Sequence, residues 1–453
     1  MHLRTGDWLT RGRARMWALA VLVAAFGGLA YLWATSDGLN DYQGRPLGTD
    51  FSNIYAGGTF VLEGRPEAPF DTPAQHAREK EIFGSATPAF GWCYPPFLLF
   101  IAAGLALMPY VTALLVWQGV TLLLYLWAMR AIILHTTSSY LPLEGGGRSR
   151  SDQEGVNLAD TQGSPPGALR APTAPLPGEA KGGDHLWLLL ALAFPAVFIN
   201  LGHGHNGFLT AALLGFGLVL LDRRPIAAGI LFGLLAYKPQ FGLMIPLVLI
   251  ASGRWPTFKA AALTLAALVL VSTIAFGPKT WSAFFESLHF TRVVVLEAGD
   301  TGLHKIQSVF SWVRMWGGSI PLAYAVQGAV TAMLAAALFW LWRSRASFAL
   351  QAAALCIAVM VATPYSLDYD MMVLAPAIAF FAVEGMARGF DAYEKSALAG
   401  LWIVPLLARS VADHTLIPIG IIMMLAVVAL TLRRAWRQCG LGEFKAAAQN
   451  AAA

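Results

Sequence analysis

The chain has 453 residues, of which 57% are hydrophobic and 13% are charged, and its formal net charge is +5. Ordinary soluble domains carry about 25% charged residues, so this composition excludes a soluble domain and indicates a polytopic membrane protein. The positive charge does not indicate nucleic-acid binding, because the basic residues lie in short clusters at the ends of apolar runs, as the positive-inside rule describes.

The first apolar run covers residues 16–35 and contains no charged residue. About 20 apolar helical residues cross a bilayer core, so this run predicts a first membrane span. It is longer than the apolar region of a signal peptide, which has about 7–15 residues, so we expect an anchor. The arginines that precede it predict a cytoplasmic N-terminus, which makes residues 36–94 the first extracytoplasmic loop. These arginines are Arg4, Arg11, Arg13 and Arg15.

Asp50 lies in an unusual part of this loop, the stretch GRPLGTDFSNIYAGG at residues 44–58. It follows a Pro-Leu-Gly turn among small or apolar residues, whereas most other acids of the loop are expected on its solvated surface. A partly desolvated carboxylate here can act as general base for a hydroxyl group whose oxygen comes within about 3 Å. The alternative is a structural role as a helix cap. The other acids are Asp41, Glu63, Glu67, Asp71, Glu79 and Glu81.

The segment FGWCYPPFLL, residues 90–99, predicts a helix start, because proline is tolerated in the first helical turn. Trp92 and Tyr94 then belong to an interfacial aromatic belt or line a sugar or lipid groove beside Asp50.

A Gly-, Pro- and Ser-rich stretch at 141–184 should form a disordered insertion. The charge pattern requires an odd number of membrane crossings between Tyr94 and Arg223. Four apolar runs lie there, so one of the short ones should be re-entrant or interfacial. The apolar runs are 95–109, 111–134, 186–200 and 207–221.

The turn NLGHGHNGFL, residues 200–209, gathers His203, His205 and Asn206. A metal site would need an acidic or cysteine partner at ligand spacing, and none is nearby. Hydrogen bonds to a polar substrate headgroup, or simple turn structure, are favoured instead. We expect no cofactor and no required metal, although Asp50 could meet the later acids in space. Cys93, Cys356 and Cys439 have neither disulfide nor metal-site spacing.

The stretch LLAYKPQFGLM, residues 234–244, places Lys238 between two apolar halves. A lysine inside a membrane segment is costly and points to function. Pro239 interrupts the helix, as is tolerated where the backbone borders a cavity. Lys238 needs an anionic partner, for which a substrate phosphate is a candidate. The alternative is that its ammonium group snorkels to the outer interface.

From residue 222 onward, basic clusters alternate with segments that lack them, which predicts the topology. We expect about ten to thirteen transmembrane helices, a second large extracytoplasmic loop at 277–320 and a cytoplasmic tail at 433–453. Within the second loop, His304, Lys305 and Arg314 lie on the same side as Asp50. The outer segments are expected near 237–240, 277–320, 363–370 and 409–414.

Asp368 and Asp370 stand at a predicted helix start in TPYSLDYDMMVL, residues 363–374. N-capping is one explanation of Asp368, because a carboxylate can accept hydrogen bonds from the free N–H groups of the first turn. Either acid could instead bind sugar hydroxyls.

Taken in order, these stretches resemble glycosyltransferase family 87, whose members use polyprenyl-phosphate sugars and have the all-α GT-C membrane architecture. The resemblance covers roughly residues 16–435 and indicates one GT-C-like domain over 1–453. The histidines replace the usual Gly-Gln before Asn206, which leaves the role of that turn open, and the insertion at 141–184 is also a departure. The matching stretches are GTDFSNIYAGGTFVLEGRPEAPFD, YPPF, GHGHNG, AGILFGLLAYKPQ, QSVFSWVR and TPYSLDYD.

The resemblance implies a polyprenyl-phosphate-linked sugar donor, a lipid or glycan acceptor and inversion at the anomeric carbon, with mannose as the precedent. Asp50 would be the general base. A phosphate leaving group needs no general acid, so one base and positive groups near the phosphate suffice. The expected substrate-binding residues are Tyr55, Tyr94, His205, Asn206, Lys238, Gln240, His304, Lys305, Arg314, Asp368 and Asp370.

We therefore expect a monomer in the cell inner (plasma) membrane, surrounded by membrane lipids, with an extracytoplasmic active site, cytoplasmic termini and no nucleic-acid partner. The competing hypothesis is a transporter or flippase of a lipid-linked or small solute. Lys238 favours it, whereas the large polar outer loops and the lack of paired broken helices oppose it. A structural scaffold would explain neither Lys238 nor the Asp50 stretch.

Overall fold

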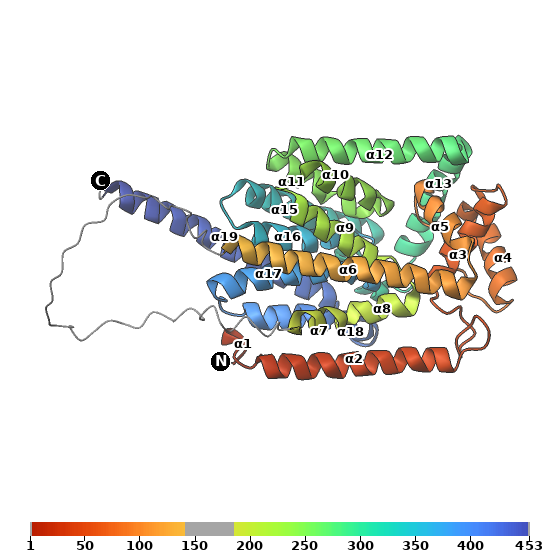
Figure 1. The fold of residues 1–453 in the computed structure, drawn as a ribbon, viewed down its shortest axis with the longest axis horizontal. Helices are drawn as coiled ribbons and strands as arrows, with labels where there is room; N and C mark the ends of the chain where they lie inside the picture. Colours follow the sequence, from red (N-terminus) through yellow and green to blue (C-terminus); the bar gives the residue numbers. More distant parts are fainter. Residues whose placement is uncertain (1, 141–184, 452–453) are drawn as a thin grey trace, which may run out of the picture.

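The computed structural model describes residues 2–140 and 185–451, and the expected insertion at 141–184 lies outside them. The described part is helical and contains no β-strand. The long helices lie along one axis of the molecule, with both termini at one end (Figure 1). We call this the termini end, and the opposite end, which carries α3, α4 and α13, the loop end. The first α-helices are α1 (His2–Thr5), α2 (Arg11–Ala34), α3 (Phe51–Leu62), α4 (Thr72–Phe83), α5 (Leu99–Ala106), α6 (Tyr110–Tyr140), α7 (Leu186–Leu192), α8 (Pro195–His203) and α9 (Gly207–Leu220).

The remaining helices continue the same axis and are joined by short helical turns. The α-helices are α10 (Pro225–Leu234), α11 (Met244–Ala251), α12 (Trp255–Phe276), α13 (Pro278–Phe290), α14 (Val309–Met315), α15 (Ile320–Arg343), α16 (Phe348–Val361), α17 (Leu374–Arg388), α18 (Glu394–Thr415) and α19 (Ile419–Ala451). The short turns are η1 (Ala68–Phe70), η2 (Pro96–Leu98), η4 (Leu235–Tyr237), η5 (Pro239–Gly242), η7 (Leu303–Lys305) and η8 (Asp368–Val373), and η6 (Thr291–Glu297) is a π-helix.

The core of the bundle is formed by α9, α16 and α17. Every residue of α16 after Phe348 is buried, and 78% of the apolar window in Asp368–Arg388 is buried, against 6% in α2 and in α12. These last two helices flank the bundle on opposite sides (Figure 1). A helix that is apolar on all sides but unburied by protein needs an apolar solvent, so α2 and α12 mark the surface that lipid would cover.

Within the described residues, seven helices are long and apolar enough to cross a membrane, or eight if α7 and α8, which bend by 43° at their junction, form one span. The protein is therefore a polytopic membrane protein, whereas the count of ten to thirteen spans and the GT-C architecture remain predictions. The seven are Arg11–Ala34, Tyr110–Leu134, Trp255–Phe276, Ile320–Arg343, Asp368–Arg388, Glu394–Thr415 and Ile419–Gly440.

The odd crossing number expected between Tyr94 and Arg223 stays a prediction, because two of the four apolar runs form short helices. The run 95–109 folds only as Pro96–Ala106, roughly 16 Å of helix at 1.5 Å per residue, too short to cross a bilayer. It packs on α3 at the loop end. The run 207–221 forms α9, whose 14 residues are about 21 Å of helix and also shorter than a bilayer core, whereas α6 and the bent pair α7–α8 are long enough to cross.

The segment around Lys238 is a hairpin that enters the bundle and returns. The turn before α10 carries Asp222 and the turn after α11 carries Arg254, and these side chains form an ion pair. Both ends of the α10–α11 pair therefore meet, and Lys238 lies at the break inside it.

On the outer side, α10 packs on α12 through glycine. A methyl group at Gly229 would come within 2.4 Å of the Thr257 oxygen, and one at Gly233 within 2.5 Å of the Thr264 side chain. Small residues that let two helix backbones approach this closely are typical of membrane-helix packing.

The termini end is fastened by polar contacts. The Arg434 guanidinium donates to Glu394 at 2.6 Å, and both side chains are buried. The backbone N–H of Tyr393 donates to the Arg4 oxygen at 2.7 Å, which attaches α1 to the start of α18. The helix α6 also ends here and α7 begins here, so the chain leaves and re-enters the described structure at this end (Figure 1).

At the loop end, segments far apart in sequence are joined. The N–H of Gln307 donates to the Ser366 oxygen at 2.7 Å, and the Ser366 hydroxyl donates to the Gln307 oxygen at 2.9 Å. The loop 277–320 is thus attached directly to the TPYSLDYD segment, beside the start of α3.

Candidate active site

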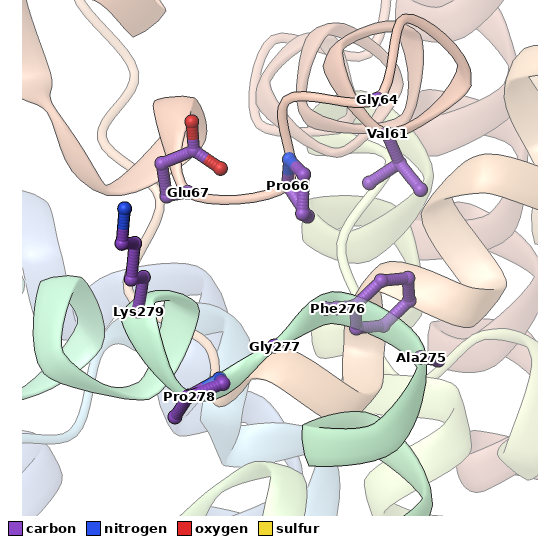
Figure 2. Close-up of a pocket in the computed structure, with 9 residues that line it drawn as sticks. All are labelled: Val61, Gly64, Pro66, Glu67, Ala275, Phe276, Gly277, Pro278 and Lys279. Carbon is purple, nitrogen blue, oxygen red and sulfur yellow. The ribbon is translucent and has the colours of Figure 1, made fainter.

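Of two cavities in the described structure, one is lined by Thr49 and His203, the neighbours of Asp50, and the other is not. The first, of about 470 Å³, lies between the end of α3 and the α12–α13 junction, with Glu67 and Lys279 facing each other across it (Figure 2). Its lining includes Val61, eleven residues after Asp50 and thus about 16 Å away along α3. None of the predicted site residues lines it. Its lining residues are Val61, Gly64, Pro66, Glu67, Ala275, Phe276, Gly277, Pro278 and Lys279.

The second cavity, of about 430 Å³, lies between α2, α6, α8 and α18, and we call it the donor-side groove. One part of its wall is apolar and the other is polar. The apolar part consists of Leu29, Leu32, Trp33, Leu47, Leu114, Leu115, Phe198, Ile199, Leu201, Pro405 and Leu406. The polar part includes Asp41, Arg45, Thr49, Gln118, His203, Asp368, Arg409 and Ser410.

Asp50 stands at the N-cap position of α3, but its side chain makes no capping hydrogen bond. The structural explanation considered for this residue is therefore wrong. Its backbone N–H donates to the His203 oxygen at 3.0 Å. The carboxylate keeps 28% of its surface exposed, so it stands partly desolvated but open to a reactant.

Two glycines in the YAGG stretch hold α3 in place. A methyl group at Gly58 would come within 2.1 Å of the Ala102 oxygen of α5, and one at Gly57 within 2.8 Å of the Trp92 ring. Glycine is thus required for α3 to reach α5 and the Trp92 loop at this distance. This packing fixes the helix that begins at Asp50.

His203 is the partner of Asp50. Its Nδ1 lies 3.5 Å from Asp50 Oδ2 and 2.7 Å from the Thr49 hydroxyl. It ends α8, and Gly204 follows with φ 64°, the left-handed conformation common after a helix C-terminus. A side chain at Gly204 would come within 2.5 Å of Phe51 Cβ, so glycine also lets α8 approach the start of α3.

The charge of Asp50 is set by opposing effects. Burial raises the pKa of the Asp50 carboxyl above its ordinary value, and the positive field of His203 opposes this rise. Asp368 raises it further, while Lys305 and Lys238 act against Asp368. A base needs a pKa high enough to accept a proton yet must be ionised at the working pH, and these neighbours push it toward that range.

The remaining charges near the polar part of the groove are both basic and acidic. The Arg409 guanidinium lies 3.8 Å from Asp368, and Arg45 pairs with Asp41 at 3.2 Å. Burial, together with the nearby Arg409, lowers the pKa of Lys305. Each arginine is thus paired with a carboxylate, and Lys305 lies close enough to Arg409 and Arg45 for their charges to act on it.

His304 lies in the same loop segment as Lys305 and contacts Asp413 across the interface with α18, with its Nδ1 3.3 Å from Asp413 Oδ1. It therefore also ties the loop 277–320 to the C-terminal end of α18.

A group of buried aromatic side chains lies next to these charged residues. The Tyr94 hydroxyl lies 3.3 Å from His205 Nε2, and the His205 ring stacks on Tyr369 at 3.3 Å between centroids. His205 Nδ1 accepts the Asn206 N–H at 2.9 Å, so Nε2 carries the proton and donates to Tyr94. Tyr94 and His205 thus support the floor of the site.

Lys238 and Asp370 form a buried ion pair, with 3% and 2% of their side-chain surfaces exposed. Asp370 also accepts the Leu367 N–H at 2.9 Å. Lys238 therefore neither snorkels nor stands free for a substrate phosphate. It anchors the α10–α11 break to the start of η8, and so holds Asp368 at the groove.

Several predicted site residues have local partners instead. The Tyr55 hydroxyl donates to the Met108 oxygen at 2.9 Å, and Arg314 donates to the backbone oxygens of Gly318 and Glu297. Gln240 lies half-buried in η5. Asn206 is buried at the start of α9, with neither side-chain polar atom paired. The structure thus brings Asp50, Lys305 and Asp368 together, whereas Tyr55 and Arg314 are held by local partners.

Sequence reasoning missed three groove residues: Thr49, Arg45 and Arg409. Arg409 offered a signal, since it is a basic residue in an outer segment that otherwise lacks basic clusters. His203 was expected to bind a polar substrate headgroup or to serve the turn, and its contact with Asp50 was not predicted. Within residues 2–140 and 185–451, no three His, Cys, Asp or Glu side chains gather as metal ligands would.

Comparison with known proteins adds one finding. The sequence model of glycosyltransferase family 87 matches residues 92–364, more than half of the chain. No curated protein matches, and no solved structure does. Asp50 precedes the matched range, and Asp368 and Arg409 follow it, so their roles depend on the geometry described above.

Proposed function

Because the chain belongs to glycosyltransferase family 87, it is a glycosyltransferase, and we propose that its donor is a polyprenyl-phosphate sugar. The sugar, a hexose with mannose as the first to be tested, is passed to a hydroxyl group of a lipid or glycan acceptor. The reaction takes place at the loop end, which we propose faces the extracytoplasmic side. Membership of this family favours glycosyl transfer over the transport of a solute.

The observation that supports this donor is the two-part wall of the donor-side groove. A polyprenyl phosphate has a long apolar chain and one charged head, and the groove has an apolar wall next to a charged part in which Arg45 and Arg409 stand beside Asp41 and Asp368. The chain would lie between α2, α6, α8 and α18, with Trp33 and Phe198 against it. The phosphate would then lie near Arg45 and Arg409, and the sugar near Asp50.

The cations serve the leaving group more than the bound donor. The bound phosphodiester carries one negative charge, and the departing polyprenyl phosphate carries nearly two. Arg409, Arg45 and Lys305 would therefore attract the phosphate most strongly as its bond to the sugar breaks. Interactions that strengthen in the transition state accelerate the reaction. The same anion would relieve the repulsion among these cations.

Asp50 supplies the base. As the acceptor oxygen approaches the anomeric carbon from the side opposite the phosphate, Asp50 takes the hydroxyl proton. The new C–O bond forms, the bond from the anomeric carbon to the phosphate oxygen breaks, and the configuration inverts. The products are the glycoside and polyprenyl phosphate, and Asp50 afterwards releases the proton to water. His203, which the Thr49 hydroxyl contacts, holds the carboxylate in position.

The test uses the purified full chain in lipid nanodiscs, given a panel of polyprenyl-phosphate hexoses and lipid acceptors. The native chain should form a glycoside without any gradient, and Asp50→Asn should reduce the rate by at least about a hundredfold, within the range typical of a general base. The matched control is Asp71→Asn, because Asp71 is exposed in the same loop and makes no capping bond.

Three results would count against the proposal. Transfer that survives in folded Asp50→Asn would move the base to another residue. Transfer from a nucleotide sugar but from no polyprenyl-phosphate sugar would remove the proposed donor. Equal loss in Asp71→Asn would show that the loop tolerates no change, and the assignment of Asp50 would then fail.

A further inference from the structure

Glu79 is a buried acid that the reaction described above does not use. It lies on α4 at the loop end, and none of its surface is exposed. Its Oε2 accepts the Phe90 N–H at 3.0 Å, which ties α4 to the loop before η2. Its Oε1 has no hydrogen-bond partner. A carboxylate oxygen that is buried without a donor is costly, so this atom needs an explanation.

A second unpaired oxygen lies one helical turn earlier. Gln75 is 1% exposed, its Oε1 also lacks a partner, and its side chain is close enough to Glu79 to act on its ionisation. Residues four apart lie on the same face of a helix. The Nε2 of Gln75 donates to the Asn53 oxygen at 3.0 Å, and Asn53 belongs to the first turn of α3, directly after Asp50.

A single proton on Glu79 would give both unpaired oxygens a hydrogen-bond partner. If Glu79 is the neutral acid, its Oε1–H can donate to Gln75 Oε1, and each buried oxygen then has a partner. Burial raises the pKa of Glu79 to about 8, and the negative charge of Asp50 contributes to this rise. The neutral form therefore prevails at pH 7.

The charged groups around Glu79 do not supply the missing donor. On α4, the Arg78 side chain faces Glu63 and Glu81, and His76 contacts the Thr87 oxygen. Lys80 is exposed. Tyr110 of α6 donates its hydroxyl to the Leu47 oxygen, and residues 84–95 include no charged side chain. Within the described structure, Asp50 is the charged group that acts on Glu79, and it is an acid.

We infer that Glu79 is a positioning residue that works as a neutral carboxylic acid: through Gln75 and Asn53 it holds α4 on the first turn of α3, and so fixes Asp50. Ionisation of Glu79 places a second negative charge near Asp50 and removes the donor to Gln75. Activity therefore falls as pH rises through the ionisation of Glu79. This inference rests on the proposed role of Asp50.

The test compares pH–rate profiles of the native chain and Glu79→Gln in nanodiscs. The glutamine amide can donate to Gln75 and accept from Phe90 as the neutral acid does, but it does not ionise. A pKa of about 8 predicts that native activity falls about tenfold between pH 7 and pH 9, while Glu79→Gln keeps its pH 7 activity. Glu81→Gln, an exposed position on the same helix, should follow the native profile.

A second measurement does not need turnover. A folded-state pKa above the ordinary value of about 4.3 means that the native protein loses stability as pH rises from about 5 to about 8, and loses no more above that pH. The unfolding temperature of the native chain should fall over this window relative to Glu79→Gln. If the two unfolding temperatures stay parallel from pH 5 to 9, Glu79 is ionised in the fold and the inference is overturned.

The two measurements separate the possible failures. If Glu79→Gln shows the pH-dependent stability difference but also loses activity above pH 8 as the native chain does, Glu79 is neutral yet does not position Asp50, and the inference fails. If Glu79→Gln is folded but inactive at pH 7, the neutral acid is not what the site requires, which also overturns it. If no transfer is detected in any variant, the proposed function fails, and the stability measurement still decides the state of Glu79.

Discussion

Removing Lys238 should destabilise the fold strongly, and removing its partner as well should restore part of the loss. Two unit charges about 4 Å apart attract by about 4 kcal/mol at an effective dielectric constant of about 20. The Lys238–Asp370 pair is almost fully buried, so Lys238→Met leaves an unpaired buried carboxylate. We expect a loss of about 3–5 kcal/mol in the free energy of unfolding.

The double variant Lys238→Met, Asp370→Asn has no buried charge at this place. Its asparagine oxygen can still accept the Leu367 N–H, as Asp370 does now. The remaining cost is one unpaired amide N–H₂ group, about 1–3 kcal/mol. The double variant should therefore be more stable than Lys238→Met alone.

Denaturant titration in mixed micelles measures these free energies. Lys279→Met is the matched control, because Lys279 is exposed and its loss should change stability by less than about 0.5 kcal/mol. Two results would refute the reasoning: a Lys238→Met variant as stable as the control, or a double variant less stable than Lys238→Met.

The other predictions concern the groove and the base. His203→Gln should move the acid limb of the pH–rate profile upward, because His203 lowers the pKa of Asp50 and the base works only when ionised; an unmoved limb would contradict the contact. Gly58→Val should separate α3 from α5 and remove most activity while lowering the unfolding temperature. Gly104→Val, where a side chain meets nothing within 4 Å, should do neither, and equal effects would exclude the packing argument. Arg409→Gln should raise the donor KM about tenfold, or about 1.4 kcal/mol, with partial rescue by Arg409→Lys; an unchanged KM would place the phosphate elsewhere.

The sequence alone predicted the helical membrane bundle and the unusual position of Asp50. Apolar runs and charge clusters are local patterns, and a turn followed by small residues is local too, so both could be read along the chain. The contacts of these residues are not local. Asp370 lies 132 residues from Lys238 in the chain. The sequence marked both residues as candidate site residues but did not indicate that they pair.

The burial of side chains within the loops was the second feature that the sequence could not predict. Most loop acids were expected to be solvated, yet Glu79 and Asp41 are buried. In α4, Glu79 stands among polar residues, and only the packing of α4 on α3 decides which side faces inward. For the same reason the sequence could not separate Arg314, whose donors bind its own loop, from Lys305, which lies near Asp50.

The place where the chain leaves and re-enters the described structure has a practical use. The C-terminal end of α6 and the start of α7 lie at the termini end, away from α3, the helix that begins after Asp50 (Figure 1). An affinity tag or fluorescent reporter inserted in place of residues 141–184 would therefore be attached far from the chemistry. Its accessibility to a membrane-impermeant label in intact cells would report which face of the membrane the termini end occupies, and a label that reacts from outside would reverse the proposed orientation.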